Sequence, residues 1–277
     1  MKQRLKDIIE ADKSTNDYSA AVYAEFGLST NKHYDILVVA PGWVPTKIMQ
    51  GFDVEITCSA THSYISGYEV KGEGFLIAWI QISPGACSLI DELSLCSVLD
   101  FDELIFIGAV GSLTKEISVG EICTPSFSVS GNLANGYLME DITQYEPFGK
   151  VYPNDSGYVL KVMERICKMG YQIKQEPVFC TDTVLCEYAH MDFIKSFGVT
   201  LIEMETSSFY LMADLFEKPA IALLVVSDNS ATGESLVLRT KEQKERYNAS
   251  RLHTIPQILI DLAAKKLSYD EKINTLR

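Results

Sequence analysis

The sequence predicts an α/β protein with three α/β/α layers, in which helices cover both faces of a central parallel or mixed sheet. Its apolar runs lack the alternation of a half-exposed strand, and stretches with helical spacing separate them. With 277 residues, 47% of them hydrophobic and 22% charged, the chain can bury a large core without disulfide bonds. We therefore expect a single domain over residues 1–277.

Strands and helices are expected to alternate along the chain. A polar, helical N-terminal extension, residues 1–32, precedes the sheet, with Ser14 or Asp17 as a helix cap. Strands are expected at the apolar runs 36–40, 75–82, 104–107, 122–123, 177–180 and 220–226. Helices are expected at 87–98, 157–169, 205–216 and 243–266, the last with a kink at Pro256. Residues 126–155, rich in Gly, Pro and aromatics, are expected to form a long loop that shapes a site or an interface.

Composition excludes several classes of function. A formal net charge of −13, without a stripe of Lys and Arg between aromatics, argues against nucleic acid as a partner. Seven scattered cysteines without a CxxC pair are typical of reduced thiols in a cytosolic protein, and four widely spaced histidines give no sign of a metal site. Neither a secretory leader nor an apolar run of ~18 residues is present, so we expect a soluble, cytoplasmic protein without a membrane partner.

Candidate chemistry lies in loops that follow the expected strands, where α/β proteins bind ligands. Glu203, Met204 and Glu205 stand at the start of an expected helix, and Asp228 directly follows the most apolar strand. A glycine turn, Gly108–Leu113, follows another strand. Each feature alone has an ordinary explanation, because carboxylates complement a helix N-terminus, Asp is a common cap and turn glycines allow close packing.

Three features together resemble the nucleoside phosphorylase and nucleosidase family. They are the pattern EMExxxxY beginning at Glu203, an Asp 23 residues beyond Glu205, and the block GxxGxL-xxxxxVGEI beginning at Gly108. The resemblance runs from about Ile36 to Ala264 and implies the fold of that family. It also implies cleavage of the N-glycosidic bond of a nucleoside, with phosphate as co-substrate and no other cofactor, by a dimer-based homo-oligomer such as a hexamer.

The resemblance also implies roles for individual residues. Asp228 would be the general acid that protonates purine N7, which favours a purine substrate. Glu205 would accept hydrogen bonds from the ribose hydroxyls, with Met204 against the sugar and Glu203 in the same ribose site. The implied base contacts are Gly111, Thr181, Val184 and Ile202. The implied phosphate contacts are Gly42, Lys47, His62, Gly108 and Ala109.

The expected phosphate site departs from the pattern of many phosphorylases. Phe106 and Ala109 replace an arginine and a serine of the strand-turn block. Lys47 takes the place of an arginine of the early loop, and His62 takes the place of an arginine that a neighbouring subunit contributes in the family. Lysine is a weaker anion ligand than a bidentate arginine. The hydrolytic branch also lacks the strand arginine, yet it uses an early-loop Glu, and residues 41–52 contain no carboxylate. Phosphorolysis, hydrolysis and nucleoside binding without catalysis therefore remain alternatives.

Overall fold

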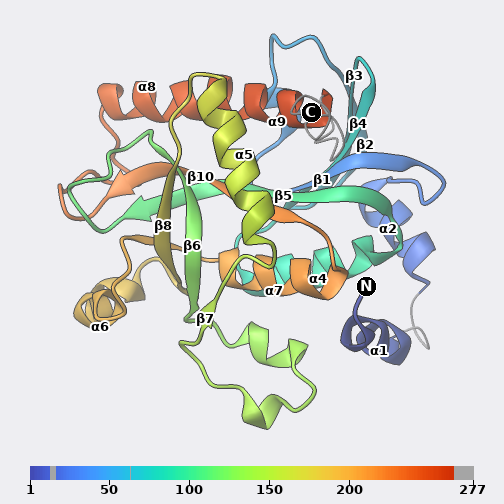
Figure 1. Cartoon of the computed structure of the whole chain (residues 1–277), viewed down its shortest axis with the longest axis horizontal. Coiled ribbons are helices and arrows are strands. Elements are labelled where there is room, and N and C mark those ends of the chain that lie inside the picture. Colours follow the sequence, from blue (N-terminus) through green and yellow to red (C-terminus); the bar gives the residue numbers. More distant parts are fainter. Residues whose placement is uncertain (13–16, 63, 265–277) are drawn as a thin grey trace, which may run out of the picture.

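The computed structural model describes residues 1–12, 17–62 and 64–264. Its strands are β1 (His33–Pro41), β2 (Glu55–Thr61), β3 (Ser66–Gly72), β4 (Phe75–Ile82), β5 (Asp100–Ser112), β6 (Ile122–Ser130), β7 (Lys150–Val151), β8 (Lys174–Cys180), β9 (Leu201–Glu203) and β10 (Ala220–Asn229). Its α-helices are α1 (Gln3–Asp12), α2 (Tyr18–Phe26), α3 (Pro45–Ile48), α4 (Ala86–Leu95), α5 (Ser156–Lys168), α6 (Met191–Lys195), α7 (Thr206–Phe216), α8 (Lys241–Ala249) and α9 (Ile255–Ala264). Helices α4 and α7 cover one face of the sheet and α5, α8 and α9 the other, which confirms the three layers (Figure 1).

The central sheet is mixed, as predicted. Strands β4, β1, β5 and β10 run parallel side by side. The β2–β3–β4 meander extends one edge with antiparallel pairs, and β6 is antiparallel to β10. The parallel strands are almost wholly buried because helices cover both faces, which explains why their sequences lack alternation.

Part of the sheet closes on itself. Strand β10 pairs with both β5 and β6, β6 pairs with β8, β8 with β9, and β9 returns to β5. This ring brings the ends of β5, β8, β9 and β10 to one place, although they are far apart in the sequence. The residues that follow these strands therefore meet.

Several elements agree closely with the prediction and others are longer. Strand β4 has the predicted bounds, and helix α5 begins and ends one residue before the predicted ones. Strand β5 was predicted to end at residue 107 but continues to Ser112, because Gly108 and Gly111 stay paired with β10. The expected loop 126–155 likewise begins with a continuation of β6 to Ser130 and contains β7 and short 3₁₀ turns. The turn-rich composition of residues 126–155 therefore did not predict that part of this segment pairs as β-strands.

Strands β2, β3 and β9 have no counterpart in the prediction. Strand β2 has only exposed and intermediate positions and no apolar run, so its sequence gives no signal of a buried strand. Strand β9 is only three residues long and borders the predicted helix. These strands depend on their partners in the sheet, which sequence periodicity does not reveal.

The terminal helices differ from the prediction in detail. Asp17 caps α2 by accepting from the amides of Ser19 and Ala20, while Ser14 lies outside the described residues. The long C-terminal helix is interrupted by a π-helical turn, Ser250–Thr254, just before the predicted kink at Pro256, which cannot donate a backbone hydrogen bond. The last two residues predicted for it, 265–266, are also outside the described residues.

Within the described ranges, the structure contains no helix with both the length and the apolar character that a membrane span requires.

Candidate functional site: a carboxylate-lined cavity

Gly111 occupies the meeting point of three strands. In the sheet it lies between Asp228 of β10 and Ile202 of β9. A Cβ atom added at Gly111 would lie 3.1 Å from Asp228 Oδ2 and 3.2 Å from Ile202 Cγ2. Only a glycine leaves room here for both side chains to lie over the end of β5, which gives the predicted glycine turn a structural purpose.

Asp228 is directed by an irregularity in β10. The pairing register with β5 shifts between Val226 and Asp228, as in a β-bulge that redirects a side chain. Ser227 donates a hydrogen bond from its hydroxyl to Asp228 Oδ1 at 2.5 Å, and Arg239 Nε donates to the Ser227 carbonyl at 2.9 Å. Burial raises the pKa of Asp228 above its ordinary value, although the Ser227 hydroxyl and the Arg239 charge oppose the rise.

Glu203 caps helix α7. Its Oε2 accepts from the backbone amides of Glu205 and Thr206 at 2.7 and 2.9 Å. Its Oε1 accepts from the Thr206 hydroxyl and the Cys180 thiol, each at 2.8 Å. Both oxygens are thus occupied within the chain, so the structure does not support the predicted direct ribose contact of Glu203. This side chain instead holds the backbone of Glu205 in place.

Glu205 is the carboxylate that remains available. It is 5% exposed and stands at the N-cap of α7 without capping the helix itself. Its Oε1 accepts a hydrogen bond from the backbone amide of Gly85, at the N-terminus of α4. Burial, with the nearby Glu203 charge, raises the pKa of Glu205 to about 8. A ligand that donates hydrogen bonds would stabilise its ionised form.

These residues line one cavity of about 230 Å³. It contains most of the residues singled out in the sequence: Gly108, Ala109, Gly111, Thr181, Val184, Ile202, Glu203, Met204, Glu205 and Asp228. The expectation that Glu205 and Asp228 share a cavity is therefore met in the geometry. Their roles toward a ligand stay predictions.

Three residues of the expected phosphate site do not line this cavity. Gly42 and Lys47 are exposed, and only the neighbouring Pro41 reaches the lining. His62 Nε2 lies 3.2 Å from the carbonyl of Ala24, beside helix α2. The early loop turns away after Pro41, which spacing in the sequence cannot show. The contribution of His62 to a neighbouring subunit is not tested by a single chain and stays a prediction.

Sequence reasoning missed one acidic side chain of the lining. Glu187 follows β8 in the segment that leads to α6, is 8% exposed and lines the cavity. Burial raises its pKa to about 7, and the charge of Asp228 contributes. No motif includes this residue; its only signal was membership of a loop after a strand. The cavity also includes Pro41, Pro84, Val110, Ser227 and Leu236.

The charge in the cavity is one-sided. Four of its described lining residues are acidic, Glu187, Glu203, Glu205 and Asp228, and none is Lys, Arg or His. Phe106, at the position of the missing arginine, is 1% exposed and lies against Phe209, with ring centroids 5.5 Å apart. The expected phosphate contacts Gly108 and Ala109 therefore have no Lys, Arg or His beside them in the lining, within the part of the chain that the structure describes.

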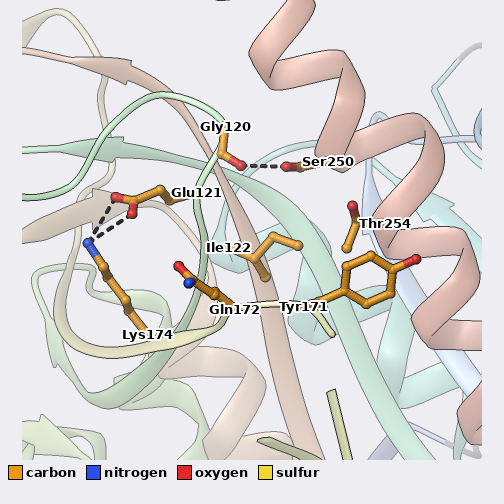
Figure 2. A pocket seen from close by; sticks show the side chains of 8 residues that line it. All are labelled: Gly120, Glu121, Ile122, Tyr171, Gln172, Lys174, Ser250 and Thr254. Atoms are coloured by element: carbon orange, nitrogen blue, oxygen red, sulfur yellow. Dashed lines mark hydrogen bonds and ion pairs between the residues drawn. The ribbon is translucent and has the colours of Figure 1, made fainter. Parts of the chain in front are cut away.

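A second cavity of similar size lies where the starts of β6 and β8 meet the π-helical turn (Figure 2). Its Glu121 and Lys174 form an ion pair at 2.9 Å, and the Ser250 hydroxyl donates to the Gly120 carbonyl. Its charged groups thus already have partners within the chain. The carboxylate-lined cavity, whose acids form no ion pair within the described part of the chain, is the better candidate for a ligand site.

One group of potential metal ligands lies elsewhere. His33, Asp35 and Asp102 bring their ligand atoms within 4.8 Å of one another at the beginning of β1. The wide spacing of the histidines along the chain did not predict this convergence. The His33 ring also contacts Asp100 at 2.9 Å and Asp102 at 3.2 Å, and the Asp100 hydrogen bond is the main cause of its raised pKa. This group is at the opposite end of β1 from the cavity, so it takes no part in that site.

Fold and cavity together describe an α/β protein with a ligand site at the carboxyl ends of its strands and with acid–base groups inside it. The sequence profile of the phosphorylase superfamily matches residues 49–260. The chain therefore belongs to the phosphorylase superfamily, whose members are phosphorylases and nucleosidases.

Individual relatives agree with this assignment. DeoD-type purine nucleoside phosphorylases of Anoxybacillus flavithermus and Geobacillus stearothermophilus are each 29% identical over 146 residues, 52% of this chain and 58% of theirs. The chain thus matches little more than half the length of these curated relatives. The crystal structure of Campylobacter jejuni 5′-methylthioadenosine/S-adenosyl homocysteine nucleosidase aligns with a TM-score of 0.65 at 15% identity, over 83% of this chain and 99% of that one. This likeness establishes the fold.

Proposed function

We propose that this protein is an enzyme that cleaves the N-glycosidic bond of a purine nucleoside. The observation that carries the proposal is the shared cavity of Glu205, a buried acid at the start of α7, and Asp228, a half-buried acid near the end of β10. Cleavage leaves a sugar with oxocarbenium character and a base that must accept a proton. One acid that holds the sugar and another that protonates the base would serve these two requirements.

Glu205 is the proposed sugar ligand. An ionised carboxylate can accept hydrogen bonds from both vicinal hydroxyls of a ribose. Because its pKa is about 8 in the empty cavity, sugar binding near neutral pH is coupled to release of a proton. Met204, also in the lining, offers an adaptable apolar surface to the ring of the sugar.

Asp228 is the proposed general acid. Burial raises its pKa, which favours the protonated form that a leaving purine requires at N7. The hydrogen bond from Ser227 and the register shift of β10 fix its orientation toward the cavity. A nearby Arg239 keeps the pKa from rising further, so the carboxyl can also release its proton.

Two acceptors for the sugar are candidates. Phosphate is the first, supported by the matched phosphorylases; Gly108 and Ala109 in the lining are its proposed contacts, and positive charge would come from Lys47 or from His62 of a neighbouring subunit. Water is the second, favoured by the absence of Lys, Arg and His from the described lining and by the buried Phe106. A phosphate dianion beside several carboxylates needs such a counter-charge.

Base release with and without phosphate tests this proposal. The purified full-length protein is incubated with adenosine, inosine, guanosine, uridine and methylthioadenosine, and free base and ribose 1-phosphate are measured. Phosphate-dependent release supports phosphorolysis, and release without phosphate supports hydrolysis. Nucleoside binding without any turnover would overturn the catalytic proposal and leave a binding protein. Light scattering on the same sample tests the proposed dimer-based homo-oligomer.

A further inference from the structure

The first turn of helix α7 carries three hydroxyl side chains that are fully buried. Thr206, Ser207 and Ser208 directly follow Glu205 in the chain. A buried hydroxyl group destabilises the folded state unless it forms a hydrogen bond. All three hydroxyls have hydrogen-bond partners, and the partners of Ser207 and Ser208 lie in the segment between β6 and β7, residues 131–149.

Asn135, in the short 3₁₀ helix Ala134–Leu138, binds both of these serines. Its Nδ2 donates to Ser207 Oγ at 3.1 Å and to Ser130 Oγ at 2.7 Å, and its Oδ1 accepts from the Ser208 hydroxyl at 2.6 Å. The side chain is 1% exposed, and both N–H groups of its amide are used. Asn135 therefore joins the end of β6 to the first turn of α7 through a buried network of hydrogen bonds, which makes this part of the structure rigid.

Two further side chains support the same turn. Asn132 Nδ2 donates to Ser207 Oγ at 3.1 Å, and the hydroxyl oxygens of Ser128 and Thr206 lie 2.7 Å apart. Because the Thr206 hydroxyl already donates to Glu203 Oε1, Ser128 is the donor in this pair. The end of β6 and the residues that follow it therefore contact every hydroxyl of the turn.

The 3₁₀ helix that carries Asn135 also contacts both helices that meet at Glu205. It packs against α4 as well as α7, and these two helices contact each other. Glu205 stands at the N-cap of α7 and accepts from the Gly85 amide at the N-terminus of α4. The position of its carboxylate thus depends on how the two helix ends lie relative to each other. A displacement of about 1 Å in an enzyme site can reduce activity by about 10²-fold.

We infer that Asn135 is a positioning residue for the sugar site, which acts on Glu205 through the first turn of α7. The inference rests on the proposed function, in which Glu205 holds the vicinal hydroxyls of a ribose. Asn135 does not line the cavity, so it does not contact the substrate itself. Glu203 fixes the backbone amides of Glu205 and Thr206, whereas Asn135 fixes the two serines that follow them. Without Asn135, α7 loses these serine contacts, and Glu205 loses its alignment with Gly85.

Binding of an uncleavable nucleoside and of its free base tests the inference. The nucleoside is 9-deazaadenosine, whose sugar is joined to the base by a C–C bond, and the base is 9-deazaadenine. Both are titrated calorimetrically into the full-length wild type and into Asn135→Leu. We expect the variant to bind the nucleoside about tenfold or more weakly and the base within about threefold of the wild type, because only the sugar contacts Glu205. A general loss of stability would not single out the sugar.

A milder variant and a matched control accompany Asn135→Leu. Ser208→Ala removes one of the two contacts between Asn135 and α7, so it should weaken nucleoside binding by about three- to tenfold and leave base binding unchanged. It carries the test if Asn135→Leu does not fold. Asn154→Leu removes an exposed amide that donates to the Lys218 carbonyl and should change neither affinity.

The possible outcomes separate this inference from the proposed function. An equal loss for nucleoside and base in Asn135→Leu and Ser208→Ala would assign Asn135 a structural role only, and unchanged nucleoside affinity would show that Glu205 is held without it. Glu205→Ala should bind the nucleoside about as weakly as the base. If Glu205→Ala keeps a preference for the nucleoside, or if the wild type binds neither ligand, the proposed function fails and the inference fails with it.

Discussion

Gly85 donates its backbone N–H to Oε1 of Glu205, 120 residues away in the chain. This contact joins the N-terminus of α4 to that of α7 and orients the acid that we propose to hold the sugar. Both helix N-termini favour negative charge, yet burial and Glu203 still raise the pKa of Glu205 to about 8. The neighbours of Glu205 therefore stabilise its ionised form only in part, so a ligand that donates hydrogen bonds can still change its protonation.

Glu205 should make folding stability depend on pH. Its pKa in the folded protein is about 8, above the ordinary value of 4.5, so the folded state binds the proton more tightly. The contribution of Glu205 to the free energy of unfolding is then largest below pH 4.5 and decreases as pH rises to about 8. Glu205→Gln, which can still accept from Gly85, should be more stable than wild type at pH 9 by roughly 1 kcal/mol or more.

Chemical denaturation of wild type and Glu205→Gln between pH 5 and pH 9 measures this difference. The advantage of the variant should shrink toward pH 5. Glu140→Gln, which alters an exposed acid, serves as the control and should show no such trend. A difference between wild type and Glu205→Gln that is constant across this range would contradict the assigned pKa.

Asp228→Asn should separate binding from catalysis. The amide cannot supply the proton that a leaving purine needs, so cleavage should slow by about 10²-fold or more. Nucleoside affinity should remain within about threefold, because the side chain keeps its shape and an acceptor for Ser227. Single-turnover base release and equilibrium binding measure the two effects. A rate equal to that of the wild type would remove Asp228 from the mechanism.

Ser227→Ala should shift the pH dependence of cleavage. The Ser227 hydroxyl donates to Asp228 Oδ1 and thereby lowers the pKa of that carboxyl. Without this hydrogen bond the pKa of Asp228 rises, and the acid stays protonated to higher pH. The alkaline limb of the plot of cleavage rate against pH should therefore move to higher pH. If the alkaline limb moves to lower pH, or does not move, Asp228 is not the titrating acid.

Gly111→Ala should obstruct the cavity while the sheet still forms. The new Cβ would lie 3.1 Å from Asp228 Oδ2 and 3.2 Å from Ile202 Cγ2, closer than most Cβ contacts. We expect nucleoside affinity or cleavage to fall by about tenfold or more, with a circular-dichroism spectrum like that of the wild type. Gly149→Ala, whose Cβ meets only a carbonyl oxygen at 3.6 Å, is the matched control. If Gly111→Ala and Gly149→Ala have the same nucleoside affinity and cleavage rate, Asp228 and Ile202 do not pack closely over Gly111.

Local sequence was sufficient for much of the fold. Buried parallel strands such as β4 must be continuously apolar because helices cover both of their faces, so their bounds could be predicted from composition alone. The EME pattern at the start of an expected helix and Asp228 after the most apolar run likewise indicated the two acids of the cavity. Strand β2 and the continuations of β5 and β6 could not be predicted in this way, because their pairing depends on partners elsewhere in the sheet.

Residues that approach from different strands could be assigned only from three-dimensional structure. Glu203 looked like a second ribose ligand, but its Oε2 accepts from the first amides of α7 and its Oε1 from the Thr206 hydroxyl and the Cys180 thiol. Lys47 looked like a phosphate ligand, but its loop turns away from the cavity after Pro41. Glu187 carried no motif, yet it lines the same cavity as Asp228 because β8 and β10 belong to one ring of strands. Periodicity and motifs in the sequence indicate which residues share one face of a single helix or strand. The closed ring of strands determines which helices and strands come together, and so it determines which side chains line the cavity.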